Sequence, residues 1–248
     1  MSHLTLSEDP PRIAPRSVRP EAPRPMSFAI LRNAHEAFRT GIRLQEQALN
    51  LGDIFAFRAE WRAFQRALAV HVAMEERLFV LLDDIGAGAI GAACLAEEHI
   101  VDERVASRVD AALAAGNPAA LRGAWTVWKA LQLRHLAHEE EIVTPLTMKT
   151  GTTPEARGRV VHEWLITPTE HLPNFDWAIG WVVQLLSEYG STAQPPEVAT
   201  RIFACGLQNA CSRSQWRRLR PIVQRHCTPS LWAGMESRFG LDGEGAIA

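Results

Sequence analysis

The sequence predicts an all-α protein: an up-down-up-down four-helix bundle followed by a helical C-terminal extension. Apolar residues recur with a helical period through most of the chain, and no segment shows the alternation typical of a strand. A short motif also occurs twice. His71 is followed four residues later by Glu75, and His135 is followed in the same way by Glu139. Residues four apart lie on one face of a helix, so each pair presents an imidazole and a carboxylate together.

Four histidines are spaced so that they meet at one level of such a bundle. His35 and His71 are separated by 36 residues, as are His99 and His135. Turn signals lie between them, at residues 50–53, 83–88 and 116–118. Both arms of a helical hairpin rise about 1.5 Å per residue, so positions equally far from the turn return to the same height.

The four bundle helices can be placed in order along residues 27–149. Ser27 can cap the first helix, which carries His35 in its apolar stripe. The second is expected over about 53–82 and the third over about 89–115, where Gly116 acts as a stop signal. The fourth starts after Pro118, a residue favoured near helix starts, and runs toward Pro145.

The two flanking regions differ from the bundle. Residues 1–26 are rich in proline and arginine with little to bury, which predicts a disordered arm. Residues 150–248 form the predicted C-terminal extension, with a helix over about 155–167, an apolar helix over 174–189 and a linker over 190–196. Three short helices are expected after it, near 197–210, 213–226 and 229–239.

Composition limits the classes of partner and the compartment. A net charge of -2 favours no polyanionic partner, so we expect no nucleic acid. An arginine-rich helix near 213–226 is interpreted as a solvated amphipathic face or an internal ion-pairing surface. The apolar stretch over 177–186 is too short for a bilayer, which predicts no membrane-spanning helix. With no CxxC pair and no apolar leader, a cytoplasmic location and buried free thiols at Cys205, Cys211 and Cys227 are favoured.

The ordered set of motifs resembles the hemerythrin-like (HHE cation-binding) family over roughly residues 28–148. The resemblance implies nitrogen ligands at His35, His71, His99 and His135. It also implies that Glu75 and Glu139 bridge two metal ions and that Glu103 is a terminal ligand.

Imidazoles and carboxylates without thiolate suit iron or manganese and tolerate zinc, so two iron ions are the leading assignment. Oxygen-carrying members of the family have a histidine where this chain has Glu103. The added negative charge favours the ferric state, and thus redox chemistry with dioxygen, hydrogen peroxide or nitric oxide over reversible oxygen carriage.

Several alternatives stay open at this stage. Asp102 or Glu98 could replace Glu103, and His138 is favoured as a residue beside the site. Glu76 and Glu140 face solvent or hydrogen-bond a ligand histidine. The alternative functions are a metal or redox sensor that reports through the C-terminal helices, which could also form a homodimer, and a structural bundle with zinc or no metal.

Overall fold

The computed structural model describes residues 29–149 and 153–239, and within these ranges every regular element is a helix. The predicted all-α class is confirmed. The predicted arm over 1–26 and the cap at Ser27 lie outside the described residues. Four long helices come first: α1 (Ala29–Leu51), α2 (Ile54–Ile85), α4 (Leu95–Ala114) and α5 (Pro118–Lys149).

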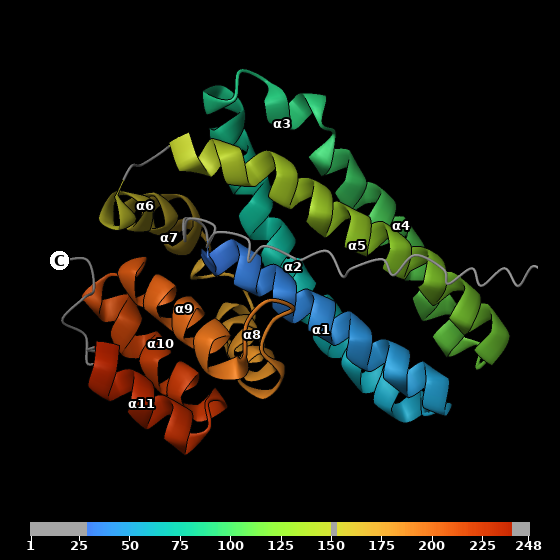
Figure 1. Cartoon of the computed structure of the whole chain (residues 1–248). Helices are drawn as coiled ribbons and strands as arrows, with labels where there is room; N and C mark the ends of the chain where they lie inside the picture. The colour runs from blue at the N-terminus through green and yellow to red at the C-terminus, as the bar shows by residue number, and fades with distance from the viewer. Residues whose placement is uncertain (1–28, 150–152, 240–248) are drawn as a thin grey trace, which may run out of the picture.

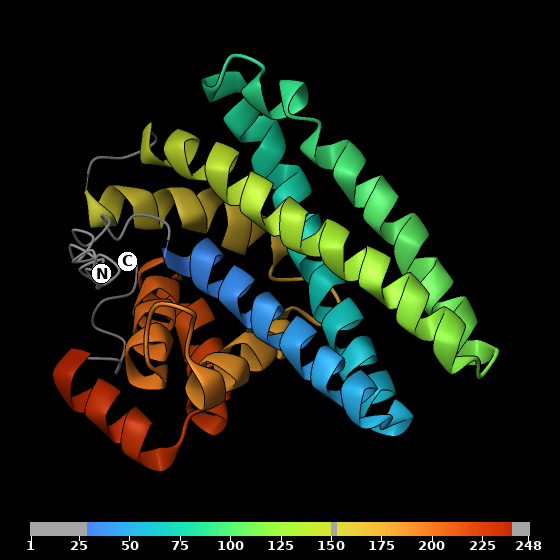
Figure 2. The same ribbon diagram turned by 45° about the vertical axis from the view of Figure 1, so that its right-hand side comes forward.

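Two glycines allow the tight turns between the paired helices. Gly52 joins α1 to α2 with φ of 71°, and Gly116 joins α4 to α5 with φ of 61°, a left-handed conformation that costs glycine little. The Asp53 carboxylate then caps α2 by accepting a hydrogen bond from the N–H of Ala56 at 2.9 Å. Figures 1 and 2 show both turns at the same end of the molecule. The hairpin of α1 and α2 and the hairpin of α4 and α5 therefore turn at the same end of the bundle.

The prediction of one continuous third helix over about 89–115 is wrong, because this helix is interrupted near its start. A short helix, α3 (Ala89–Ala92), precedes α4, and Cys94 between them has a positive φ of 55°. Asp83 at the end of α2 accepts hydrogen bonds from the N–H groups of Ile90 and Gly91, at 2.8 and 2.9 Å. These bonds satisfy backbone N–H groups in the first turn of α3. Local sequence did not indicate that α3 is separate from α4.

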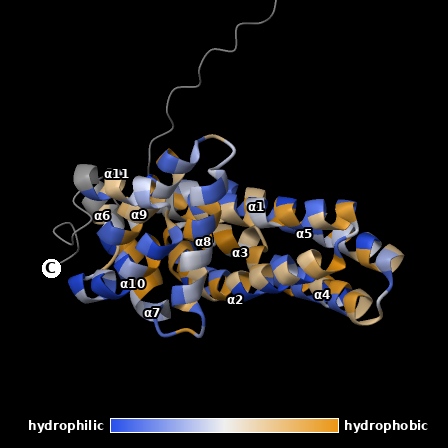
Figure 3. Cartoon of the chain, turned by 90° about the horizontal axis from the view of Figure 1, so that it is seen from below, coloured by the Kyte–Doolittle hydropathy of each residue, from blue (hydrophilic) through white to orange (hydrophobic). Residues whose placement is uncertain are grey.

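Aromatic rings fill the bundle on the side of the two tight turns. Trp61 and Trp128 meet edge to face with ring centroids 4.6 Å apart, and Phe64 contacts Trp128 at 5.1 Å. All three are fully buried. Each large ring removes substantial apolar area from water, so this cluster is a main source of the bundle's stability. Figure 3 shows hydrophobic residues between the helices and many hydrophilic ones on the outer surface.

The C-terminal helices pack against the first two helices of the bundle. They are α6 (Pro154–Val161), η1 (His162–Ile166), α7 (Thr167–Thr169), α8 (Phe175–Tyr189), α9 (Pro196–Asn209), α10 (Arg213–His226) and α11 (Pro229–Phe239). The helix predicted over 155–167 is thus divided by a π-helical turn, η1. α8 and α9 both contact α1. Among the described residues, no helix is long and apolar enough to cross a membrane.

Gly41 permits the close approach of α8 to α1. A Cβ atom at this position would lie 3.1 Å from the Trp181 ring of α8 and 3.0 Å from Phe64. Trp181 in turn contacts Phe38 of α1, with ring centroids 5.2 Å apart. The C-terminal region is therefore joined to the bundle by the same aromatic core that supports the histidines.

Candidate metal centre

Six of the seven predicted site residues come together between the four long helices. α1 contributes His35, α2 contributes His71 and Glu75, α4 contributes His99, and α5 contributes His135 and Glu139. His35, Glu75 and Glu139 are almost completely buried, at 0%, 1% and 0% exposure. The repeated spacing of histidine and glutamate thus corresponds to one internal polar site.

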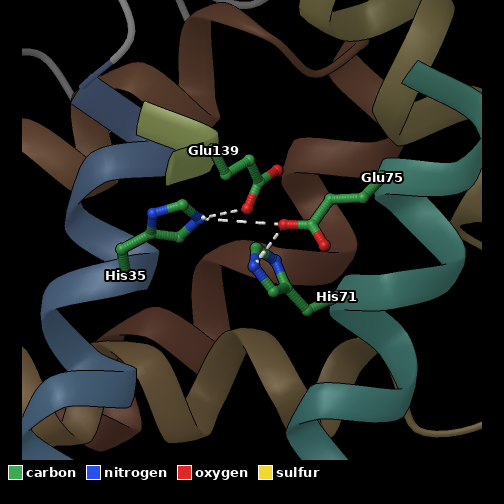
Figure 4. A group of neighbouring side chains, drawn as sticks. All are labelled: His35, His71, Glu75 and Glu139. Atoms are coloured by element: carbon green, nitrogen blue, oxygen red, sulfur yellow. Dashed lines mark ion pairs between the residues drawn. The ribbon is translucent and has the colours of Figure 1, made fainter. Parts of the chain in front are cut away.

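The first group consists of His35, His71, Glu75 and Glu139, drawn in Figure 4. Nε2 of His35 lies 3.3 Å from Oε2 of Glu139 and 3.7 Å from Oε1 of Glu75. The same Glu75 oxygen is paired with Nε2 of His71. Two imidazole nitrogens and two carboxylates therefore converge on one point from three helices, as metal ligands in a helical bundle do.

The second group shares Glu75 with the first and adds His99 and His135. Oε2 of Glu75 lies 3.3 Å from Nε2 of His99, and the Nε2 atoms of His99 and His135 are 3.1 Å apart. Oε2 of Glu139 is 3.9 Å from Nε2 of His135. Each carboxylate therefore faces a histidine of both groups, which is the arrangement of a ligand that bridges two cations.

Glu103 is the one predicted ligand that lies apart from both groups. Its side chain is exposed, whereas the neighbouring Asp102 is buried. The buried face of α4 continues from His99 to residue 102, three positions on, and this register turns residue 103 outward. Asp102 accepts a hydrogen bond from Nε1 of Trp128 at 3.2 Å, and burial raises its pKa to about 6.

Two glutamates outside the groups hold histidines of the site through their Nδ1 atoms. Nδ1 of His35 is 2.9 Å from Oε1 of Glu140, and Nδ1 of His135 is 2.8 Å from Oε2 of Glu98. A carboxylate at Nδ1 keeps the proton there and leaves Nε2 free as a ligand atom. His138 also contacts Glu98, at 3.2 Å, which agrees with the expected place beside the site.

The two central carboxylates have opposite pKa shifts. Burial raises the pKa of Glu75, but the charge of His71 and the close contacts with nitrogens of three histidines reverse this effect and hold the pKa well below its usual value. Burial and the neighbouring charge of Glu75 raise the pKa of Glu139 well above its usual value. The pair thus resists carrying two negative charges unless positive charge is supplied nearby.

The pattern of unpaired atoms fits a metal centre. Nε2 of His35 and His71 and both oxygens of Glu75 and Glu139 are buried without a hydrogen bond of regular geometry. Buried polar atoms are almost always hydrogen-bonded, so six such atoms that lie together without regular hydrogen bonds indicate a site suited to a cation. Nitrogen and oxygen donors without sulfur suit iron, manganese or zinc ions. Elsewhere in the described ranges, no further group of potential ligands is found.

A surface hollow of about 120 Å³ opens beside the second group. His135 and Glu98 line it together with Val101 and Leu131, and Arg134 and Glu97 add charges at its edge. Local sequence does not predict this hollow, because its walls come mainly from α4 and α5, whose relative rotation is a tertiary property. Of the six candidate ligands grouped above, His135 is the one that lines this hollow.

Other histidines and the cysteines lie away from this site. His171 and Glu163 are exposed, and Nδ1 of His162 is hydrogen-bonded to the carbonyl of Ala210 at 3.0 Å. The four cysteines are free thiols. Cys211 and Cys227 are buried as predicted, whereas Cys205 is only partly buried. The contact of Glu140 with a ligand histidine was one of the alternatives left open from sequence, whereas Glu98 was considered there only as a ligand in place of Glu103.

Fold and site together define a helical cation-binding protein with a buried histidine and carboxylate centre. Residues 26–147 match the family model described as the Hemerythrin HHE cation binding domain, and this part of the chain belongs to that family. The resemblance inferred from the motifs is confirmed. Searches of curated proteins and of solved structures found no match.

Proposed function

We propose that the centre holds two metal ions, preferably iron, and that the protein reacts with dioxygen, hydrogen peroxide or nitric oxide. The observation that carries this proposal is the shared carboxylate of Glu75, whose two oxygens face different pairs of histidines. One ion would lie near His35 and His71, and the other near His99 and His135. Manganese or zinc would fit the same donors.

The protein's own residues would hold the two ions close together and offset part of their positive charge. Glu75 and Glu139 each reach both groups, so their charges would offset the repulsion between two cations. Glu140 and Glu98 make His35 and His135 stronger donors through hydrogen bonds at Nδ1. Stronger donation stabilises the ferric state and thus favours redox chemistry. This effect of Glu140 and Glu98 takes the role that the sequence analysis gave to the charge of Glu103.

Iron, when bound, would supply electrons to a small oxidising molecule. The residues around the centre would exclude bulk water, since Phe38 packs on His71 and Phe79 stacks on His99, at 4.8 and 5.7 Å. The hollow beside His135 would admit a diatomic molecule or peroxide. Its walls include an arginine and two glutamates, which favour a small polar or neutral molecule over a large anion.

The test combines metal content, absorption spectrum and turnover. Protein expressed with iron should contain about two irons per chain, absorb in the near ultraviolet and visible range, and consume peroxide or nitric oxide. His71→Ala and Glu139→Ala should lose the iron and the reaction while staying folded. Iron that is absent from the wild type, or unaffected by both substitutions, would refute the proposal.

A second candidate is a non-catalytic sensor of iron, oxygen or redox state. It is favoured by the contacts of α8 and α9 with α1, the helix that carries His35. Metal-dependent protection of the C-terminal helices without turnover would support the sensor. A cytoplasmic location, the absence of a nucleic-acid partner and a homodimer through the C-terminal helices also belong to the proposal. Gel filtration with light scattering tests the dimer.

A further inference from the structure

A continuous chain of hydrogen bonds leads from the metal centre to the C-terminal region. Nδ1 of His35 contacts Oε1 of Glu140 at 2.9 Å, and the same oxygen accepts from Nη1 of Arg39 at 2.8 Å. Arg39 also donates to Oε1 of Glu36 at 3.2 Å. Glu36 accepts from the N–H and the hydroxyl of Thr192, at 2.8 and 3.1 Å. Thr192 lies in the loop between α8 and α9.

Each member of this chain needs its neighbours. Glu36 is 7% exposed, and both of its oxygens are used within the chain. Arg39 is the cation between two carboxylates, Glu36 and Glu140. A buried carboxylate that loses its donors costs much more than an exposed one, so the removal of one member affects the next.

The conformation of the loop between α8 and α9 directs the N–H of Thr192 toward Glu36. The N–H of Ser191 donates to the carbonyl of Gln194 at 2.8 Å and closes a tight turn around Thr192. Gly190 precedes this turn with φ of 68°, and a Cβ atom there would meet the same carbonyl oxygen at 2.6 Å. The loop is thus a fixed anchor for the outer end of the chain.

We propose that Arg39 and Glu36 are positioning residues of the metal centre, and that the C-terminal region, through Thr192, completes their support. The inference rests on the proposed function, because it concerns how firmly Nε2 of His35 is presented to a metal ion. Glu140 orients His35, Arg39 orients Glu140, and Glu36 holds Arg39 against the loop. Metal binding and order in the loop over 190–195 are then linked, and by linkage each strengthens the other by the same factor.

The experiment uses zinc, a redox-inactive ion that the donor set accepts, with the full-length protein. Zinc affinity is measured by competition with a chromophoric chelator, and hydrogen exchange of the peptide covering Ser191–Gln194 is measured with and without zinc. The variants are Glu36→Gln, which weakens the charged link, and Thr192→Val, which removes only the hydroxyl donor. Thr192→Ser restores that donor and serves as the rescue. Circular dichroism checks that each variant is folded.

Arg66→Gln is the matched control, because Arg66 also ties the bundle to the C-terminal region without belonging to the chain. Its Nε donates to Asn174 at 2.7 Å, and its guanidinium lies 4.1 Å above the Trp177 ring. If the C-terminal region were loosened in general, zinc affinity would fall in Arg66→Gln as it does in the variants of the hydrogen-bonded chain. If the chain supports His35 specifically, zinc affinity falls only in the variants of the chain.

We expect zinc to slow exchange in the loop of the wild type and to bind about three- to tenfold more weakly in Glu36→Gln. Thr192→Val should show a smaller loss that Thr192→Ser recovers, and Arg66→Gln should bind zinc as the wild type does. Zinc affinities equal to that of the wild type in all variants, or a loss in Arg66→Gln equal to that in Glu36→Gln, would overturn this inference. Neither result would contradict the proposed metal centre. A wild type that takes up neither zinc nor iron would refute the proposed function and this inference together.

Discussion

Oε2 of Glu75 lies 3.3 Å from Nε2 of His99, whereas Oε1 of the same carboxylate faces His71, one turn earlier on α2. One side chain thus connects the two groups of candidate ligands. A two-metal centre therefore depends most on Glu75. Loss of Glu75 should change the metal content more than loss of a single histidine does.

Glu75→Ala should remove both metal ions, whereas His99→Ala should remove chiefly the ion of the second group. The physical reason is that Glu75 belongs to both groups and His99 to one. Metal analysis of purified protein checks this, with expected contents near zero and near one ion per chain. Glu76→Ala is the matched control, since Glu76 is the exposed neighbour on the same helix. Equal metal content in Glu75→Ala and His99→Ala would contradict a bridging role.

Glu103→Ala and Glu98→Ala should differ in metal affinity. Glu103 is exposed, so its removal should leave affinity unchanged. Glu98 holds Nδ1 of His135 at 2.8 Å, and loss of such a support typically weakens metal binding about 10- to 100-fold. Chelator competition measures both variants. A large loss in Glu103→Ala alone would show that Glu103 turns inward when metal binds.

Asp102→Asn should stabilise the metal-free protein at neutral pH. Burial raises the pKa of Asp102 from 3.8 to about 6, so the folded state holds this proton more firmly than the unfolded state. The group's favourable contribution is complete below pH 3.8 and is lost as the pH rises through about 6. Asparagine is neutral throughout, and its advantage at pH 7.5 should reach up to about 3 kcal/mol.

Urea unfolding of the metal-free protein at pH 4 and pH 7.5 measures this gain. It should nearly vanish at pH 4, where the aspartic acid is itself protonated in the folded state. Asp110→Asn is the control, because Asp110 also accepts from a tryptophan, at 2.7 Å from Nε1 of Trp61, but is exposed. A gain at pH 7.5 that is equal in both variants would exclude burial of Asp102 as the cause.

Val101→Trp should slow the reaction with peroxide or nitric oxide without loss of metal. Val101 lines the hollow that opens beside His135, and an indole there would fill much of it. Stopped-flow kinetics of the reduced protein checks this, and we expect a fall of about tenfold or more, equivalent to about 1.4 kcal/mol in barrier. Val127→Trp places the same ring at an exposed site outside the hollow. Unchanged rates in Val101→Trp would show that small molecules enter elsewhere.

Gly41→Ala should destabilise the protein, whereas Gly123→Ala should stabilise it. Both glycines lie inside helices, where alanine is intrinsically favoured by about 1 kcal/mol. A Cβ at Gly41 meets the buried rings of Phe64 and Trp181 at 3.0 and 3.1 Å, and this overpacking costs about 1–3 kcal/mol. At Gly123 no neighbour lies within 4 Å. Thermal melts of the two variants should therefore shift in opposite directions, and a rise in Tm for Gly41→Ala would contradict the close approach of α8.

Much of the fold was accessible from local signals. The glycines at 52 and 116 predicted the two turns at the same end of the bundle, and both have the positive φ that explains the choice of residue. The break before α4 was missed because the positive φ at this turn falls on Cys94, and not on a glycine that would mark it in the sequence. The division of the chain near residue 150 stays a prediction.

The sequence by itself determined where the long helices of the bundle lie, because helical periodicity, caps and glycine turns are local properties. The repeated histidine and glutamate spacing also placed six candidate ligands on inner faces. Only the tertiary structure decided the rest. A rotation of α4 by a fraction of a turn separates Asp102 inside from Glu103 outside, and this rotation is set by packing against α5. The chain from His35 to Thr192 joins residues 157 positions apart, and no local pattern encodes such a contact because it exists only once the helices have packed.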